Sequence, residues 1–228
     1  MKLSVLIPAY NENDTLDEII QRVQNVPYHK EIIIVDDFST DGTREKLKNY
    51  ESVDDIHVFY HDRNRGKGAA VRSAIEKMSG DVAVIQDADL EYDPQEYDVL
   101  LEPILKKQAD VVFGTRFMGG QPHRVLFFWH YVANKVITLL SNTFTNLNLT
   151  DIECCYKVFR KEVLDSIELE EDRFGIEPEI TAKVARGDWR IYEVAVSYFG
   201  RTYAEGKKIG WKDGVKAIWC IFKYGIFK

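Results

Sequence analysis

Short apolar runs alternate with longer stretches of helical spacing over the first half of the chain. Each apolar run is brief and partly β-branched, which predicts strands near residues 3–7, 31–35, 56–60, 81–85 and 110–113. The stretches between them predict helices near residues 14–25, 41–49, 67–79 and 94–107. This alternation is typical of an α/β fold in which helices flank a mostly parallel central sheet.

The pattern changes after residue 115. Residues 122–146 predict a long aromatic and apolar helix, "ECCYKVF" and "WRIYEVAV" predict strands, and "EPEITAKVARG" predicts a helix. In residues 211–228, Trp, Ile and Phe recur at helical spacing with Lys between them, which predicts an amphipathic helix. Such a helix either lies in a membrane interface or packs on the domain. The aromatic cluster near residue 124 is either a lipid-facing acceptor loop or part of the core.

Polar residues gather where the predicted strands end. The clusters are "PAYNEN", "DDFSTDGT", "HDRNRGKG" and "QDADLEY", one after each of the first four strands. In sheets of this kind, ligands bind in the crevice outside the carboxyl ends of the strands. These clusters are therefore the candidates for a functional site.

The second and third clusters each have two interpretations. In "DDFSTDGT", one of Ser39, Thr40 and Asp41 is expected to cap the next helix. Capping does not explain the two acids before them, and one of these acids is a candidate acceptor for hydrogen bonds from a base or ribose.

"HDRNRGKG" has neither the dinucleotide nor the Walker spacing. It is either an anion-binding helix start or a capped one with solvated Arg and Lys.

The fourth cluster is more specific. Asp87, Asp89 and Glu91 follow an apolar strand at a spacing of two, so an extended chain would point all three to one side. Three like charges repel one another unless a cation or a set of donors lies between them. A DxD pair supplies hard oxygen ligands to Mg²⁺ or Mn²⁺, which then keeps its other positions for water and phosphates. The alternative is a set of solvated loop acids.

Composition narrows the class of protein. The chain has 228 residues, 45% hydrophobic and 29% charged, with a net charge of −7, which argues against nucleic acid held on a broad basic surface. No stretch approaches the roughly 20 apolar residues that span a bilayer, and the N-terminus does not resemble a secretory signal. The three cysteines lack metal-ligand spacing and suggest reduced thiols in a cytosol.

Four motifs together carry a resemblance. The stretches "SVLIPAYNENDTL", "IIIVDDFSTDGT", "NRGKGAAVRSAI" and "DVAVIQDADLEYDP" resemble the family-two glycosyltransferases, which use nucleotide-diphospho-sugars and have the GT-A fold. Within that family the chain is similar to the branch of dolichol-phosphate mannose synthase and its bacterial polyprenyl-phosphate relatives. Later stretches, among them "TDIECCYKVFRKEVL" and "YFGRTYAEGKKIGWKDG", extend the likeness over nearly the whole chain.

The resemblance implies roles for particular residues. It assigns the sugar-nucleotide pocket to Pro8, Ala9, Tyr10, Glu12, Asp37, Lys67 and Asp87, with Asp37 near the base or ribose and Lys67 near the sugar-nucleotide. It assigns a Mg²⁺ or Mn²⁺ ion, and through it the diphosphate, to Asp87 and Asp89. Relatives often have Gln as a further metal ligand where this chain has Glu91. The residues expected to act in catalysis are Asp89, Arg116, Arg201 and Lys208.

The basic residues of that set match positions that hold phosphates in the resembled enzymes. A guanidinium fork binds phosphate oxygens bidentately, whereas Lys acts as a point charge. The stretch "RTYAEGKKI" has one residue more than the pattern of the resembled enzymes, so Lys207 is an alternative to Lys208. The expected organisation is a single domain over residues 1–210, with a nucleotide-binding half (1–115) and an acceptor half (116–210), followed by the helix of residues 211–228.

The implied reaction is an inverting transfer of sugar from a UDP- or GDP-sugar. The expected acceptor is a polyprenyl phosphate, which is already anionic near neutral pH because a phosphomonoester loses its second proton near about pH 6. The alternative acceptor is a glycan hydroxyl, which needs a base, and Glu177 and Glu179 are the candidates. Both acids could instead favour a helix N-terminus. A non-catalytic sugar-nucleotide binding protein is a distant alternative. We expect a cytoplasmic protein with a peripheral contact at the inner membrane face.

Overall fold

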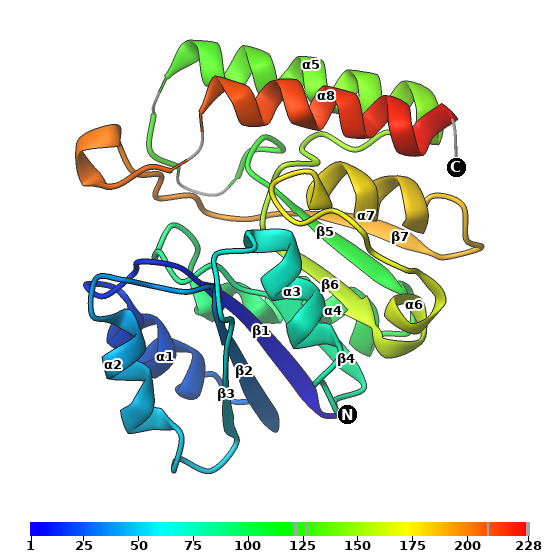
Figure 1. The fold of residues 1–228 in the computed structure, drawn as a ribbon. Helices are drawn as coiled ribbons and strands as arrows, with labels where there is room; N and C mark the ends of the chain where they lie inside the picture. Colours follow the sequence, from blue (N-terminus) through cyan, green and yellow to red (C-terminus); the bar gives the residue numbers. More distant parts are fainter. Residues whose placement is uncertain (121–122, 126, 209, 227–228) are drawn as a thin grey trace.

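A seven-stranded sheet forms the centre of the protein (Figure 1). The structure, a computed structural model, describes residues 1–120, 123–125, 127–208 and 210–226. The strand order is β3-β2-β1-β4-β6-β5-β7. The strands are β1 (Leu3–Ala9), β2 (Lys30–Asp36), β3 (Ile56–Tyr60), β4 (Val82–Ile85), β5 (Val111–Thr115), β6 (Lys157–Arg160) and β7 (Ile191–Ala195). The mostly parallel sheet predicted from the alternating pattern is thereby confirmed.

One strand runs against the others. β6 is antiparallel to both of its neighbours, β4 and β5, whereas the remaining pairs are parallel. The start of β6 therefore lies at the edge where β4 and β5 end. The segment of residues 150–156, which leads into β6, reaches the same edge as the polar clusters of residues 1–115.

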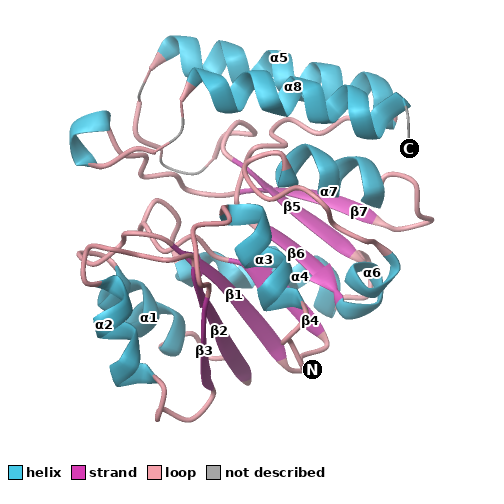
Figure 2. Ribbon diagram, in the orientation of Figure 1, coloured by secondary structure: helices cyan, strands magenta, loops and turns pink. Residues whose placement is uncertain are grey.

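Helices cover both faces of the sheet (Figure 2). α3 contacts β1 and β2 and lies in front of the sheet in Figure 1, while α4 contacts β5 and β6 and lies behind it. The helices are α1 (Leu16–Gln24), α2 (Thr43–Leu47), α3 (Lys67–Ile75), α4 (Tyr97–Leu105), α5 (Phe128–Thr145), α6 (Lys161–Ser166), α7 (Ile176–Val184) and α8 (Trp211–Ile226).

Several predicted boundaries are wrong. The helix predicted over 41–49 is the short α2 followed by a 3₁₀ turn, Lys48–Tyr50, and the one predicted over 94–107 begins with a 3₁₀ turn, Pro94–Glu96. "ECCYKVF" is a strand only from Lys157 onward, because the backbone N–H of Cys155 bonds to the Tyr92 hydroxyl instead of to a neighbouring strand. α6 was not predicted. The predicted starts and ends at residues 122 and 228 lie outside the described residues.

α5 and α8 form a separate layer above the sheet. They lie side by side in Figure 1, and both contact α7 beneath them. The buried side of α8 includes Ala217, Cys220 and Tyr224, so this amphipathic helix packs on the domain. Its opposite side leaves Trp211 and Trp219 mostly exposed. No helix within the described part of the chain is long and apolar enough to cross a bilayer.

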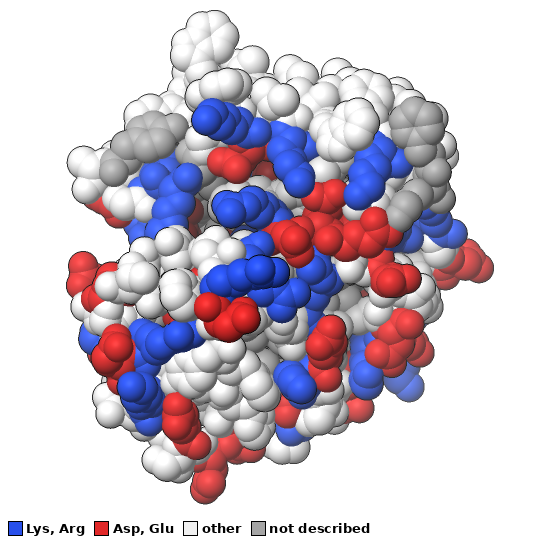
Figure 3. All heavy atoms as spheres, in the orientation of Figure 1, with Lys and Arg blue, Asp and Glu red and all other residues white. Residues whose placement is uncertain are grey.

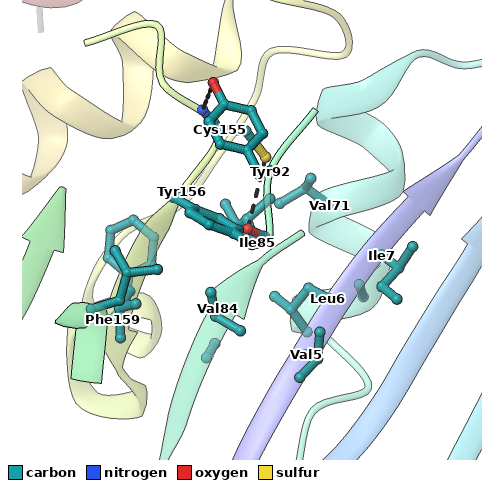
Figure 4. Close-up of a cluster of buried hydrophobic side chains, with 14 of the residues drawn as sticks. Val5, Leu6, Ile7, Val71, Val84, Ile85, Tyr92, Cys155, Tyr156 and Phe159 are labelled. Carbon is teal, nitrogen blue, oxygen red and sulfur yellow. Dashed lines mark hydrogen bonds between the residues drawn. The ribbon is translucent and has the colours of Figure 1, made fainter. Parts of the chain in front are cut away.

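The core fixes the end of β4 (Figure 4). Val84 and Ile85 pack with Val5, Leu6 and aromatic rings from later in the chain, among them Tyr156. The next residue, Gln86, is fully buried, and its side-chain carbonyl accepts hydrogen bonds from the hydroxyls of Tyr97 and Tyr156, each at 2.8 Å.

The amide of the same side chain donates to the backbone carbonyl of Asp87 at 3.0 Å. Buried polar groups that are fully bonded hold one geometry. The strand therefore delivers Asp87 and the acids after it at a defined place.

Candidate active site

The ends of β1 and β4 bring acidic and basic side chains together. In the view of Figure 3, Lys, Arg, Asp and Glu gather in a band below the α5–α8 layer. The site described below lies at the carboxyl edge of the sheet, as the polar clusters predict.

Asp87 belongs to a row of alternating charges. The ammonium of Lys67, the first residue of α3, lies 2.9 Å from Asp87 Oδ1 and 3.5 Å from Glu177 Oε1. The other oxygen of Glu177 pairs with Lys157, which is completely buried. Burial opposes the charge of Lys67, but the two carboxylates raise its pKa well above the usual value. The row holds two acids and two cations, so it balances its own charge.

Asp89 faces a different cation. Arg201 donates from one guanidinium nitrogen to Asp89 Oδ2 at 3.0 Å and from two to the carboxylate of Glu12 at 3.2 and 3.3 Å. Lys208 donates to Glu12 Oε1 at 2.6 Å and to the backbone carbonyl of Asn11 at 3.0 Å. The structure therefore brings together four residues predicted for the site, from three distant parts of the chain.

Asp89 lies in an environment that disfavours its negative charge. Burial, with the negative charges of Asp87 and Glu91, raises the pKa of Asp89 to about 7 despite the nearby Arg201. A carboxyl group in this state gains from any further cation that comes within reach.

Glu91 anchors the segment that carries the arginine. Its carboxylate accepts hydrogen bonds from the backbone N–H of Arg201 at 2.7 Å and from the hydroxyl of Tyr198 at 3.0 Å. Its backbone carbonyl accepts from the N–H of Phe199 at 3.0 Å. The metal-ligand role expected for Glu91 stays a prediction, and the anchoring of residues 198–201 is an additional role.

The residues fit a divalent cation only in part. The side chains of Asp87 and Asp89 offer oxygen atoms, the ligands that Mg²⁺ and Mn²⁺ prefer. Within the described residues, however, no three His, Cys, Asp or Glu side chains converge on one point. A metal here would take at most two carboxylates from the protein and its remaining ligands from water and a bound diphosphate. This sparse coordination suits a metal that arrives with its substrate.

Asp37 holds a loop in place. It is buried, and its carboxylate accepts from the backbone N–H groups of Arg65 at 2.8 Å and Gly66 at 2.7 Å, with His61 Nδ1 at 2.7 Å. Gly66 has a φ of 104°, and a Cβ there would lie 2.4 Å from the carbonyl oxygen of Asp172, so only glycine fits. Asp37 thus shapes the "HDRNRGKG" loop, and its expected contact with a base or ribose stays a prediction.

The neighbouring acid and the predicted cap have structural partners. Asp36 is fully buried and accepts a hydrogen bond from Arg44 Nε at 2.8 Å. Asp41 accepts from the backbone N–H of Thr43 at 3.0 Å, but the N-cap of α2 is Gly42, which makes no side-chain cap bond. The predicted cap by Ser39, Thr40 or Asp41 is therefore wrong. Pro8, Ala9 and Tyr10 lie at the end of β1, and the Tyr10 ring lies 5.7 Å from the Lys208 ammonium. These three residues precede Glu12 at the edge of the site. Their nucleotide-binding role stays a prediction.

Arg116 is committed to a neighbour. Two of its guanidinium nitrogens donate to the fully buried Asp151, at 2.6 and 2.7 Å, and its guanidinium carbon lies 5.0 Å from the Tyr198 ring centroid. Part of the fork expected to hold a phosphate is thus bonded to the protein.

The alternative to Lys208, Lys207, does not contact Glu12 in the described structure, and its ammonium lies over the Phe127 ring.

The two candidate bases differ. Glu179 is fully buried, and its oxygens accept from the backbone N–H groups of Glu170 at 2.7 Å and Glu171 at 2.8 Å. Lys183 adds an ion pair at 2.7 Å. Glu177 lies between Lys67 and Lys157. Both acids are therefore engaged in the fold, and neither presents an unpaired carboxylate to an acceptor.

Sequence reasoning missed several residues of this site. Lys157 and Glu153 were predicted as part of the strand "ECCYKVF", Gln86 was only a member of the cluster "QDADLEY", and Asp151 was given no role of its own. Their roles depend on partners 20 to 70 positions away, such as Glu177 for Lys157 and Tyr156 for Gln86. The local signal that could have singled out Gln86 was its position at the end of a predicted strand, directly before Asp87.

Known proteins resemble the chain in sequence. The family model described as "Glycosyl transferase family 2" matches residues 4–168. Dolichol-phosphate mannosyltransferase of Pyrococcus furiosus is 31% identical over 214 residues, which are 92% of this chain and 60% of that protein. Undecaprenyl-phosphate mannosyltransferase of Micrococcus luteus is 29% identical over 92% of this chain and 88% of that protein. The chain thus spans under two thirds of the first relative and most of the second.

Solved structures share the fold. Glucosyl-3-phosphoglycerate synthase of Mycobacterium tuberculosis, crystallised with Mn²⁺, UDP and phosphoglyceric acid, superimposes with a TM-score of 0.76 over 99% of this chain and 78% of that one. The sequence identity is 19%, so the likeness concerns the fold. The GT-A fold predicted from the motifs is confirmed.

Proposed function

The chain belongs to glycosyl transferase family 2, and we propose that it transfers a sugar from a nucleotide-diphospho-sugar to the phosphate of a polyprenyl lipid. The observation that carries the proposal is a set of ion pairs at the carboxyl edge of the sheet, in which Asp87 pairs with Lys67, Asp89 with Arg201 and Glu12 with Lys208. Polyprenyl phosphates appear in the names of the two relatives, a dolichol-phosphate and an undecaprenyl-phosphate mannosyltransferase, which supports this acceptor class.

The chemistry follows from the charges. The acceptor oxygen attacks the anomeric carbon from the face opposite the diphosphate, and negative charge develops on the diphosphate as it leaves. Arg201 and Lys208 lie where they would stabilise that charge with fixed donors, which is electrostatic catalysis. Asp87 and Asp89 would hold a divalent cation, which when bound supplies further positive charge to the same oxygens. Residues 1–115 would hold the nucleotide and residues 116–210 the acceptor.

A phosphate acceptor is consistent with the ion pairs of Glu177 and the hydrogen bonds of Glu179. An anionic phosphate attacks without losing a proton, whereas a glycan hydroxyl needs a base. Glu177 is paired with two lysines and Glu179 accepts two backbone hydrogen bonds, so neither is ready to take a proton.

A lipid acceptor requires contact with a membrane. The described residues near position 124 are exposed: Val125 by 86%, Phe128 by 66% and Trp129 by 75%, so they do not belong to the core; Leu126 lies outside the described residues. On α8, Trp211 is 77% and Trp219 61% exposed. The top of the molecule over α5 and α8 is mostly uncharged in Figure 3, with Lys side chains below it. We place the inner face of the membrane against this layer.

The test measures nucleotide release from UDP- and GDP-sugars. Each donor is incubated with Mn²⁺ or with EDTA, with and without a short-chain polyprenyl phosphate, beside Asp89→Ala and the surface variant Asp62→Ala as a matched control. We expect one donor class to release nucleotide only with metal, faster with lipid phosphate, and not in Asp89→Ala. Release that responds to a glycan hydroxyl and not to the lipid phosphate would contradict the acceptor.

A further inference from the structure

Two buried side-chain atoms lack a hydrogen-bond partner in the part of the chain that the structure describes, and both lie in the site. They are Arg201 Nε, a donor, and Glu153 Oε1, an acceptor. Arg201 bonds its acidic neighbours through its other nitrogens. Glu153 has not been given any role so far.

Glu153 stands at the catalytic edge because of the reversed strand. It belongs to residues 150–156, which precede the antiparallel β6 and therefore lie where β4 and β5 end. Its carboxyl group interacts electrostatically with Glu177, Lys157, Arg116 and Asp151. Glu153 is thus near members of both the Asp87–Lys67–Glu177–Lys157 row and the Arg116–Asp151 pair.

The cations around Glu153 are already bound to other acids. Arg116 is bonded to both oxygens of Asp151, and Lys157 is bonded to Glu177. Burial and the charge of Glu177 raise the pKa of Glu153 to about 7, so the carboxyl group lies in an environment that does not compensate its charge. A buried carboxylate oxygen without a donor lowers the stability of a fold, and such groups persist mainly at functional sites.

The chemistry of the missing partner is constrained. Glu153 needs a hydrogen-bond donor, so it would repel a phosphate and attract a hydroxyl group. In a nucleotide-sugar the groups rich in hydroxyl donors beyond the diphosphate are those of the transferred sugar. The residue as a whole is only partly buried, whereas its Oε1 atom is shielded.

We propose that Glu153 is a specificity-determining residue that accepts a hydrogen bond from a hydroxyl of the donor's sugar. This inference rests on the proposed function, since it assumes a nucleotide-sugar donor. Glu153 touches the sugar and leaves the nucleotide and diphosphate to the acids and bases of β1, β4 and residues 198–208. It takes no proton from the acceptor.

The test separates sugar binding from nucleotide binding. Binding of GDP, GDP-mannose, UDP and UDP-glucose, each with Mn²⁺, is measured by calorimetry for the wild type, Glu153→Ala and Glu153→Gln. We expect Glu153→Ala to bind one nucleotide-sugar roughly tenfold to hundredfold more weakly and to bind its nucleoside diphosphate as the wild type does. Glu153→Gln keeps an acceptor oxygen and should lose less.

A second measurement distinguishes recognition from a structural role. Thermal unfolding of Glu153→Ala should occur at or above the wild-type temperature, because an unpartnered acid is removed. Glu193→Ala is the matched control, since Glu193 accepts from the backbone N–H of Thr150 at 2.8 Å in the same segment and its loss should lower the unfolding temperature.

Three results would overturn the inference. They are equal loss of nucleotide and nucleotide-sugar affinity in Glu153→Ala, unchanged affinity for both nucleotide-sugars, or a clear fall in its unfolding temperature. A fourth is a Glu153→Gln variant that binds the donor normally but has lost turnover, which would make Glu153 a base. Failure of the wild type to transfer sugar to any lipid phosphate would contradict the proposed acceptor alone, because the binding comparison does not use the acceptor.

Discussion

Arg201 donates a hydrogen bond to Asp89 at 3.0 Å across 112 positions of the chain. The same guanidinium bonds Glu12, so one cation joins the ends of β1 and β4 to the segment of residues 198–208. This segment, held on its other side by Glu91, brings its positive charge to the acids that are expected to hold the metal. The active edge is thus assembled by pairing of opposite charges before any substrate arrives.

Replacing Arg201 should impair transfer strongly. Arg201→Ala removes a fixed donor from the place where negative charge develops, and we expect kcat/KM for the donor to fall roughly 100- to 1,000-fold. The matched control is Arg22→Ala, because Arg22 pairs with Glu18 on the surface of α1, away from the site. Initial rates of nucleotide release measure both. Equal rates for the two variants would remove Arg201 from the reaction.

Variants of Glu91 can distinguish its role as an anchor of residues 198–201 from a role as a metal ligand. If Glu91 acts only as an anchor, Glu91→Ala should speed hydrogen exchange of the Arg201 amide and lower kcat. It should nevertheless need the same Mn²⁺ concentration for half-maximal release as the wild type. Titration of Mn²⁺ and hydrogen exchange by mass spectrometry provide the two readings. A roughly tenfold higher Mn²⁺ requirement in Glu91→Ala would show instead that Glu91 is a ligand, through about 1.4 kcal/mol of lost binding.

Glu179 should matter for stability. Removing its carboxylate leaves two buried backbone N–H groups and Lys183 without their partner, so Glu179→Ala should lower the free energy of unfolding by about 3 kcal/mol. The surface variant Glu18→Ala should lower it by less than about 0.5 kcal/mol. Urea unfolding measures both. A stable Glu179→Ala protein that had lost turnover would restore Glu179 as a candidate base.

Glu31 predicts a loss of stability in acid. Burial opposes its charge, but hydrogen bonds from Lys2, Ser4 and Ser79 outweigh burial and lower its pKa from 4.5 to about 2. A carboxyl group with a lowered pKa in the folded state stabilises the fold above its unfolded pKa. That stability should disappear as the pH falls from about 5 toward 2.

Comparison with Glu31→Gln isolates this contribution. The variant should be less stable than the wild type at pH 7, and the difference should shrink to nothing near pH 2. Thermal unfolding at a series of pH values measures it. A difference that is the same at every pH would mean that the charge of Glu31 does not contribute.

The α5–α8 layer predicts a lipid contact. Trp211→Ser and Trp219→Ser should each weaken binding to vesicles with anionic lipid by about tenfold, because each removes an exposed aromatic group that would enter the interface. Tyr192→Ser, at an exposed site on β7, is the control. Vesicle sedimentation gives the partition. Wild-type protein that stays with the supernatant would contradict the membrane face.

Local pattern was enough for the first five strands and for the acids at their ends. β4 is a continuous apolar run and β1 and β2 are mostly apolar. Asp87 and Asp89 come directly after β4 in the sequence, so their place beside its end needs no tertiary information. α6 was missed because its six residues are too few for a helical period. The inner half of "ECCYKVF" was misread because the Tyr92 hydroxyl competes for its backbone, and that contact joins residues 63 positions apart.

The partners of the site residues could not be predicted for the same reason. Nothing in "TDIECC" reveals that Asp151 bonds to Arg116 while Oε1 of Glu153 finds no hydrogen-bond partner among the described residues. Nor does the sequence around Asp37 reveal that its carboxylate holds Arg65 and Gly66. Such pairings depend on which loops the folded sheet brings together. The kind of residue at each strand end, in contrast, can be read from the sequence alone.

The reversed β6 divides the protein into parts that could be exchanged. Residues 116–156 leave the sheet at the end of β5 and return at the start of β6, so both junctions lie at the active edge and the β4–β6 ladder is left whole. Such a stretch can be replaced as a cassette without a change in strand order. We expect a chimera carrying this stretch from a relative to keep the acids that follow β1 and β4 while exchanging Arg116, Asp151 and Glu153 together, so this part of the site can be replaced as one piece.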